Sequence, residues 1–208
     1  MPRVSAAAGR KRIVAAAAKE FAARGYAGAN MDRVAHAARL NKAMIYYHFR
    51  NKLALYREIL RDMFQAVRAG VLQAAASTAT PDDKIRAYID AIADAAEARP
   101  HFPRIWLREI AEGGEHVDAA TIAYVRDVVA ALRSIIEDGH RAGRFRRIDP
   151  LLLQAGIIAP LMFFFAMGRL RQKIERAGAG RSGLSNLSRQ AVVDHLQRVT
   201  LAQLEGTL

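Results

Sequence analysis

The sequence predicts an all-α protein, on three observations. Hydrophobic residues make up 52% of the 208 residues, and alanine, the residue with the highest helix propensity, is abundant. Only six prolines interrupt the chain. Apolar residues recur mainly three and four positions apart, which places them along one face of a helix. We therefore expect about nine helices, with an amino-terminal helix-turn-helix head of three helices followed by a larger helical regulatory and dimerisation domain.

The amino-terminal segment is expected to be a flexible arm over residues 1–8, followed by a first helix over residues 9–24. Gly25 is a plausible end signal for this helix, because glycine readily adopts the backbone conformation that ends helices. Charged residues interrupt the alanine-rich start, so no secretory signal is evident. One face of the first helix is apolar, with Ile13, Ala17 and Phe21.

Residues 30–50 contain two short helical patterns joined by a tight turn, which is typical of a helix-turn-helix. Leu40 lies in the turn, and Asn41 can cap the second helix. Ile45 and Phe49 are four residues apart and face inward together. The second helix is then free to enter a DNA major groove. The first of the two helical patterns within residues 30–50 has an apolar face that consists of Met31, Val34, Ala35 and Ala38.

The outward residues of the second helix suit DNA contact. Ala43 and Tyr47 point away from the core, with Lys42 and Tyr46 beside them. A small residue allows close approach to base edges, while phenols and a lysine can reach phosphates. Lys52 lies in the first turn of the next helix. Its ammonium group and the amino terminus of that helix can bind the same phosphate. An ordinary helical hairpin with a solvated face would show the same pattern.

Positive charge is concentrated near the amino terminus. The net charge is +12, and residues 1–60 hold 12 Lys and Arg against 3 Asp and Glu. The remaining 148 residues hold 20 against 17. Contact with phosphates requires such a basic region. A membrane surface or an acidic protein partner would also be consistent with it.

Residues 9–58 resemble the amino-terminal DNA-binding domain of TetR-type transcriptional repressors. The most specific part is Ile45-Tyr46-Tyr47-His48-Phe49, which ends two residues before the pair Asn51-Lys52. The family usually has glycine where Arg39 and Ala43 stand, a Thr or Ser pair where Ala29 and Asn30 stand, and often an acidic residue where Leu53 stands. The other residues that carry the resemblance are Arg12-Ile13, Ala16 to Phe21, Gly25-Tyr26, Val34-Ala35, Ala38 and Asn51.

The resemblance implies a DNA-binding domain over residues 9–68, with its motif at about 30–50. Such a domain binds double-stranded DNA at an inverted-repeat operator as part of a homodimer. The residues that we expect to contact DNA are Asn30, Arg33, Asn41, Lys42, Ala43, Tyr46, Tyr47, His48 and Lys52.

Residues 77–208 are expected to form the second helical domain. Asn51 can cap a long helix that reaches about Ala76. Thr80-Pro81-Asp82-Asp83 is a strong helix start, with a cap, a proline at the first position and acids at the positive end of the dipole. Residues 176–187 are rich in Gly and Ser and should be mobile. The further helices are expected at 81–99, 103–112, 118–142, 151–168 and 188–204.

The helix at 151–168 is the most apolar in the chain. Its 18 residues reach the lower limit for a membrane span. Gln154, Gly156 and Pro160 interrupt it, and an apolar helix can equally be buried in a bundle or between subunits. We therefore expect no membrane insertion but a two-fold homodimer. The resemblance implies that the last two helices form the interface. From the apolar pattern of these helices, the residues that we expect there are Leu161, Phe164, Val192, Leu196 and Val199.

No catalytic site is evident. There is no Gly-rich phosphate loop, nucleophile elbow or paired-histidine zinc motif, and cysteine is absent. Glu109, Glu112, Glu115 and His116 have the spacing of metal ligands on a helix, but a solvated helix end explains them more simply. We therefore expect no enzyme activity, no cofactor and no metal site.

A small-molecule site is suggested by aromatic and apolar residues in the second domain. Such residues commonly line pockets, although they fill cores more often. In the family that the chain resembles, effectors bind between helices of this region. The expected effector-pocket residues are His101, Phe102, Trp106, Met162 and Phe163.

Together these features predict a cytoplasmic, sequence-specific transcriptional regulator. The expected form is a repressor that leaves its operator when a small apolar effector binds. The absence of cysteine suits a reducing compartment. The alternative is an architectural or non-specific DNA-binding protein that uses the basic head without operator choice or effector.

Overall fold

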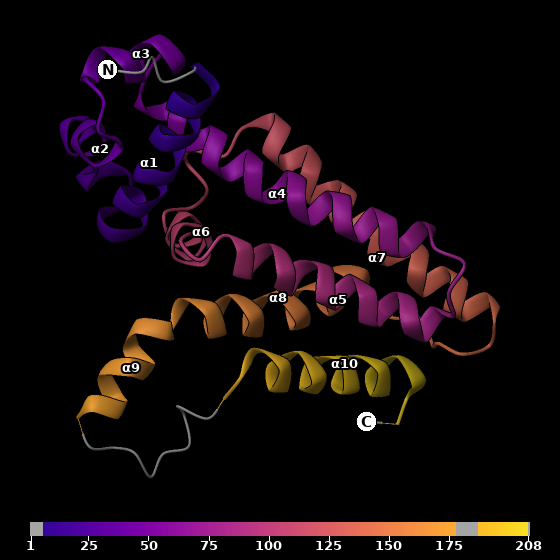
Figure 1. Ribbon diagram of the computed structural model, residues 1–208. Helices are drawn as coiled ribbons and strands as arrows, with labels where there is room; N and C mark the ends of the chain where they lie inside the picture. The colour runs from indigo at the N-terminus through magenta and orange to yellow at the C-terminus, as the bar shows by residue number, and fades with distance from the viewer. Residues whose placement is uncertain (1–5, 178–186, 208) are drawn as a thin grey trace. The chain divides into compact units, whose positions relative to one another are not determined.

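The computed structural model describes residues 6–177 and 187–207, and within these ranges it contains α-helices and no strands (Figure 1). The prediction of an all-α protein is confirmed. The described helices are α1 (Ala6–Gly28), α2 (Met31–Ala38), α3 (Lys42–His48), α4 (Lys52–Ala76), α5 (Pro81–Ala98), α6 (Phe102–Ala111), α7 (Ala119–Arg141), α8 (Pro150–Ala166), α9 (Gly168–Arg176) and α10 (Arg189–Glu205).

The chain forms two compact units. The head unit comprises residues 1–64 and 101–122, and the body unit comprises residues 65–100 and 123–208. Helices α4 and α7 each contribute residues to both units. Helix α6 belongs to the head unit, although it lies within the range 77–208 that we expect to form the second domain.

Helix α1 starts at Ala6, so residues 6–8 of the predicted arm are helical, while residues 1–5 lie outside the described residues. The three alanines there have high helix propensity. Gly25 breaks the helix as predicted, with φ 72° and ψ 179°. A side chain at Gly25 would also meet Arg108 of α6, because a Cβ there would lie 2.7 Å from Arg108 Nη1. Glycine at this position therefore allows both the kink and the close packing of α6 on α1.

The core of the head unit contains the apolar faces that the sequence predicts. Ile13, Ala17 and Phe21 of α1 are buried. Phe49 is buried but follows α3 in an extended conformation and is not part of the helix. The other buried residues of this core include Met31, Val34, Ala35, Ala38, Ile45, Leu55 and Ile59.

Aromatic side chains extend the head core between α4 and α6. The Phe64 ring packs edge-on against Trp106, with centroids 4.8 Å apart, and against Phe102 at 5.5 Å. Phe102 is buried and Trp106 is half-buried. Phe102 and Trp106, two of the expected effector-pocket residues, therefore pack in the aromatic core of the head unit.

The body unit is held together by α5. Thr80 caps this helix, because its hydroxyl accepts a hydrogen bond from Asp83 N, as the start signal predicts. Tyr88 is fully buried, and its hydroxyl lies 2.6 Å from Gln154 Oε1 on α8 and 3.1 Å from Val128 O on α7. Gln154, which looked like an interruption of an apolar helix, thus has a buried partner.

Helix α8 ends at Ala166, two residues earlier than expected, and α9 continues after a bend of 49°. No helix was expected at residues 169–175, because their charged residues do not continue the apolar pattern. Most of the segment 176–187 that we expect to be mobile lies outside the described residues, although Arg176 ends α9. No single described helix is long and apolar enough to cross a membrane; α8 and α9 meet that criterion only as a bent pair.

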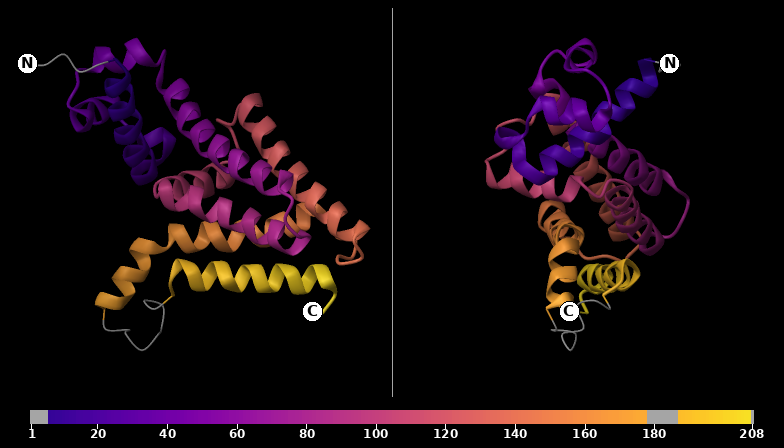
Figure 2. Two further views of the ribbon diagram at one scale, coloured as in Figure 1. Left: turned by 45° about the vertical axis from the view of Figure 1, so that its right-hand side comes forward. Right: turned by 60° about the vertical axis from the view of Figure 1, so that its left-hand side comes forward.

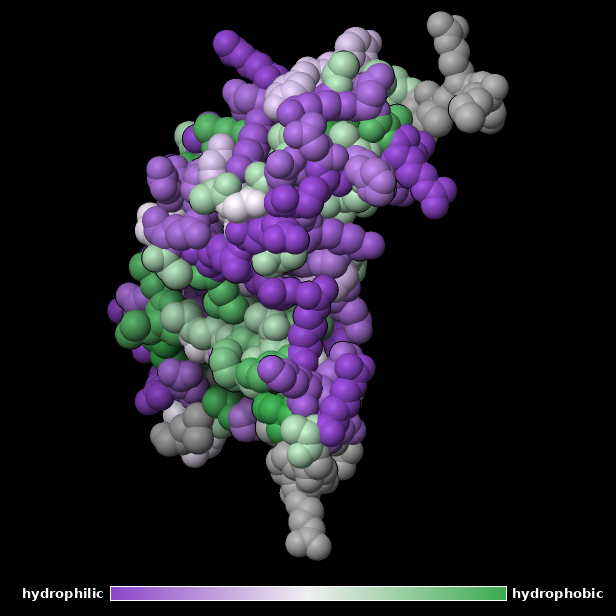
Figure 3. Space-filling model, turned by 90° about the vertical axis from the view of Figure 1, so that its left-hand side faces the viewer, coloured by the Kyte–Doolittle hydropathy of each residue, from purple (hydrophilic) through white to green (hydrophobic). Residues whose placement is uncertain are grey.

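Helix α10 packs against α8 and α5, and α8 and α10 run side by side in two views (Figures 1 and 2). Leu153, Ile157 and Leu161 of α8 are buried, as are Val193 and Leu204 of α10. Other apolar residues of this pair remain exposed. Hydrophobic residues gather in the lower part of Figure 3, whereas hydrophilic residues cover most of its upper part. The most exposed large apolar residues of the body unit are Leu151, Leu152, Phe163 and Leu170.

Candidate DNA-binding surface

Helix α2 is fixed at its start by two of the residues that we predicted to contact DNA. Asn30 Oδ1 accepts hydrogen bonds from Asp32 N at 2.7 Å and Arg33 N at 3.4 Å. Arg33 donates to Glu20 on α1 and to Gly28 O. Burial opposes ionisation of Glu20, but the hydrogen bonds from Arg33 and Asn30 N hold its pKa below the ordinary value. Asn30 and Arg33 thus position α2 in this conformation.

The turn between α2 and α3 contains the left-handed residue that helix-turn-helix motifs commonly need. Arg39 has φ 53° and ψ 46°, the conformation for which glycine is normally preferred. Arg12 of α1 donates from its guanidinium to Ala38 O and to Arg39 O. A side chain on a neighbouring helix therefore holds the turn by satisfying carbonyl groups at the end of α2.

Helix α3 presents the predicted outward face. Asn41 caps it by accepting a hydrogen bond from Met44 N at 2.9 Å. Ile45 is 1% exposed, whereas Tyr47 is 76% and Tyr46 45% exposed. Ala43 is exposed as well. The rotational orientation of α3 is therefore the one that the spacing of Ile45 and Phe49 predicts.

The polar residues around α3 have intramolecular partners. Lys42 Nζ lies 2.9 Å from Asp32 Oδ2, and this exposed ion pair raises the pKa of Lys42, first through its hydrogen bond. Lys52 Nζ donates to Ala27 O at 3.2 Å and lies 4.7 Å from the centre of the Tyr26 ring. Lys52 therefore also braces the end of α1.

His48, which we expected to contact DNA, is half-buried at the end of α3. Its Nε2 is buried and has no hydrogen-bond partner, and a Cβ added at Gly9 would lie 3.5 Å from it. Nε2 therefore faces α1 in this conformation. Local sequence patterns could not anticipate this, because the residue that packs on His48 lies far away in the chain.

Three exposed cations of the head unit are not among the residues that we predicted to contact DNA. Lys11, Arg39 and Arg50 are exposed, and their side chains have no hydrogen-bond or ion-pair partner within the described part of the chain. Arg39 and Arg50 precede and follow the second helix of the motif. Their position on either side of this helix is the sequence feature that indicates contact with phosphates.

The expected effector and interface residues fall in different surroundings. His101, Phe102 and Trp106 belong to the head unit, whereas Met162 and Phe163 belong to the body unit. A cavity of about 300 Å³ lies between α8, α9 and α10, and most of its lining is apolar. It is lined by Pro160, Phe163, Phe164, Met167, Arg171, Leu187, Ala191, Val192, His195 and Leu196.

The predicted solvated helix end at Glu109 to His116 is wrong for two of its residues. Glu109 is fully buried and His116 is 9% exposed. Glu109 accepts hydrogen bonds from Tyr56 Oη at 2.8 Å and from His116 N at 2.7 Å. Burial, and then the hydrogen bond to Glu109, raise the pKa of Tyr56, so this hydroxyl stays a neutral donor. A buried carboxylate is stable here because its lone pairs are satisfied.

Two family models match the chain. The model of bacterial regulatory proteins of the tetR family matches residues 13–59, and the model of the tetracyclin repressor-like C-terminal domain matches residues 81–198, more than half of the chain. The chain belongs to the TetR family. This membership confirms the resemblance of the helix-turn-helix segment and extends it to the regulatory domain.

Known TetR-family proteins are similar over much of the chain. The transcriptional repressor NicS of Pseudomonas putida is 28% identical over 162 residues, which cover 77% of this chain and 76% of NicS. The transcriptional repressor SCO4008 of Streptomyces coelicolor is 34% identical over 136 residues, or 64% of this chain and 65% of SCO4008. The crystal structure of the TetR-family regulator PfmR from Thermus thermophilus has a TM-score of 0.73 at 26% identity, and covers 93% of this chain and 99% of that chain.

These relatives are transcriptional regulators. Together with the exposed face of α3, they establish that this TetR-family protein is a DNA-binding transcriptional regulator. The prediction of this function class is confirmed.

Proposed function

We propose that the protein is a homodimeric repressor that binds an inverted-repeat operator through α3 and leaves it when a small apolar effector binds. The observation that supports the proposal most strongly is that α3 is held by its inner face and exposes its outer face. Asn41 caps the helix, Ile45 anchors it, and Tyr47 is 76% exposed on the opposite face. A rigid helix with a small residue and two phenols outward suits the major groove.

The proposed contacts fall into two classes. Ala43, Tyr46 and Tyr47 face base edges and nearby phosphates. Lys42 is paired only with exposed Asp32, so a phosphate can replace this carboxylate at little cost. Arg39 and Arg50 supply further charge on either side of α3, whereas Asn30, Asn41 and Arg33 act by holding the motif in place.

The proposed dimer forms through α8 and α10. A two-fold dimer that reads one DNA face needs its recognition helices about 34 to 36 Å apart. Val199 is 37% exposed, and Val192 is half-buried on the same helix. Leu161, Phe164 and Leu196 are nearly buried within the single chain, so they support the interface from beneath. The exposed apolar residues Leu151, Leu152 and Phe163 of α8 extend the apolar surface available to a partner.

The proposed effector site is the apolar cavity between α8, α9 and α10. Phe163 and Phe164 line it, and Arg171 lies 4.0 Å from the centre of the Phe164 ring. A small apolar molecule suits such a lining. Because Val192 and Leu196 also line the cavity, a bound ligand would contact residues of the proposed interface. It shifts the dimer only if it prefers the arrangement that fits DNA poorly.

A charge in the proposed interface tests this function. Val199→Glu places a carboxylate on the exposed part of α10, and Ala130→Glu places the same charge on an exposed position of α7 as a control. We expect Val199→Glu to be monomeric in sedimentation experiments and to lose tight binding to a duplex selected by the wild type. Leu196 is unsuitable because it is 5% exposed, and a charge there would unfold the body unit.

The control variant should remain dimeric and bind the same duplex with unchanged affinity. A Val199→Glu monomer that bound the full duplex as tightly as the wild type would contradict the proposed dimer mechanism.

A further inference from the structure

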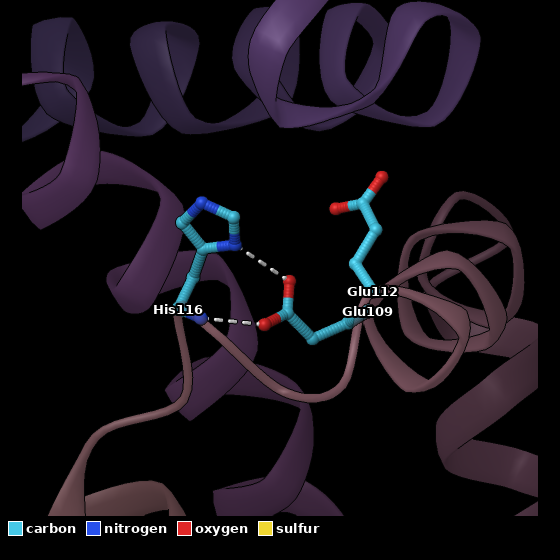
Figure 4. Close-up of side chains that lie close together, drawn as sticks. All are labelled: Glu109, Glu112 and His116. Atoms are coloured by element: carbon cyan, nitrogen blue, oxygen red, sulfur yellow. Dashed lines mark hydrogen bonds and ion pairs between the residues drawn. The ribbon is translucent and has the colours of Figure 1, made fainter.

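The buried cluster at the end of α6 brings three metal-binding side chains together. Glu109 lies in the last turn of α6, Glu112 directly follows the helix, and His116 lies in the turn beyond. One ligand atom from each lies within 4.8 Å of the other two. Figure 4 shows the Glu112 carboxylate extending toward the His116 ring on the side that faces Glu109.

Surrounding groups already fix two of the three ligands. Glu109 Oε1 accepts from His116 N, and Oε2 accepts from Tyr56 Oη. The His116 ring packs against Tyr26, with centroids 3.9 Å apart, and edge-on against Tyr56 at 5.3 Å. Metal sites depend on such outer partners to orient their ligands. The cluster is therefore more ordered than a chance group of surface carboxylates.

The distances suit a small divalent ion. Glu109 Oε2 and His116 Nδ1 are 3.1 Å apart. Two ligands that are each about 2.0 to 2.1 Å from a tetrahedral ion lie about 3.3 to 3.4 Å from one another. The ion would lie between these two atoms, where they now contact one another. Glu112 is exposed, and its side chain has no hydrogen bond or ion pair among the described residues, so it is free to complete the site.

We propose that Glu109, Glu112 and His116 bind a divalent transition-metal ion of the zinc type. One imidazole nitrogen and two carboxylate oxygens form a ligand set that suits Zn²⁺ better than Mg²⁺, which prefers oxygen ligands alone. Water would occupy the fourth position. The metal requires a deprotonated nitrogen of His116, so its affinity should fall at acid pH.

The ion would connect both ends of the turn that follows α6. This turn contains Gly113 and Gly114, both at φ 77°, between Glu112 and His116. Two consecutive glycines make the segment easy to deform. A metal bound by residues on both sides restrains it, and binding to the folded state alone raises the stability of the head unit.

The experiment uses the full chain without an affinity tag, after treatment with a chelator. Isothermal titration with ZnCl₂ should show one ion per chain, and Zn²⁺ should raise the unfolding temperature. Glu112→Gln should lower the affinity about tenfold or more. Its unfolding temperature without metal should equal that of the wild type, because Glu112 takes no part in the buried hydrogen bonds. Glu115→Gln, an exposed neighbour outside the cluster, should bind Zn²⁺ like the wild type.

Three results would overturn the proposal. The first is a wild-type chain that binds no stoichiometric Zn²⁺. The second is a Glu112→Gln variant that binds Zn²⁺ as tightly as the wild type. The third is equal stabilisation by Mg²⁺ at the same concentration, which would contradict the assigned class of metal.

Discussion

Arg39 adopts a left-handed backbone conformation that an L side chain tolerates poorly. The strain is roughly 1 kcal/mol, and the guanidinium of Arg12 holds the turn in spite of it. Arg39→Gly should therefore raise the free energy of unfolding by up to about 1 kcal/mol, reduced by the larger unfolded-state entropy of glycine. Urea unfolding measures the change, with Arg39→Ala as the control that keeps the strain. An Arg39→Gly variant less stable than Arg39→Ala would contradict this explanation.

Tyr47 is the most exposed large side chain of α3, so its substitution should alter DNA binding without altering the fold. Tyr47→Ala should leave the free energy of unfolding within about 0.5 kcal/mol of the wild type. It should change both affinity and the preference among operator sequences, whereas Tyr47→Phe isolates the contribution of the hydroxyl. Fluorescence anisotropy on a panel of duplexes provides the measurement. Unchanged affinity and preference for Tyr47→Ala would show that another face reads DNA.

The sequence pattern identified which side chains of the motif lie inside but not what their polar neighbours contact. Ile45 and Tyr47 were placed correctly because helical spacing alone determines that they lie on opposite faces of the helix. Arg33 and Lys52 looked equally available for DNA, yet their partners Glu20 and Ala27 lie 13 and 25 residues away. Pairings at that range depend on the packing of α1, which local patterns do not specify.

Helix ends were predictable where a side chain caps the backbone. Asn41 and Thr80 cap α3 and α5 as expected, and Asp149 caps α8. The break between α8 and α9 was not, because apolar periodicity continues smoothly to Gly168. Buried polar contacts were also missed, as at Glu109, whose partner Tyr56 lies on another helix. Such contacts depend on tertiary packing and leave no periodic signal.

The ion pair between α5 and the end of α7 predicts a pH dependence of stability. The hydrogen bond from Lys84, opposed by burial, holds the pKa of Asp138 below its ordinary value of 3.8. A lowered pKa in the folded state stabilises the fold above the unfolded pKa, and this contribution is lost as pH falls through the folded pKa. Asp138→Asn should therefore destabilise the protein by about 1 kcal/mol at pH 7. The difference should shrink below about pH 4; a constant difference from pH 7 to pH 3 would contradict the assignment.

For the complete dimer, the proposed release mechanism implies reciprocal coupling. If an effector in the cavity lined by Phe163 and Leu196 weakens operator binding, operator DNA must weaken effector binding by the same factor. The sequence pointed to Phe163 for such a site, and it lines the cavity. Phe102 and Trp106 instead fill the head core, which composition could not distinguish from a pocket lining.

The central claim is that α3 reads a specific inverted repeat. The most direct test is selection of bound duplexes from a random double-stranded DNA library by the wild-type chain at fixed salt concentration. We predict enrichment of a two-fold symmetric sequence whose half-site centres lie about 10 to 10.5 base pairs apart, or a multiple of this. Bound duplexes that show no common sequence and differ from the library only in length would contradict this claim, and would identify a non-specific DNA-binding protein.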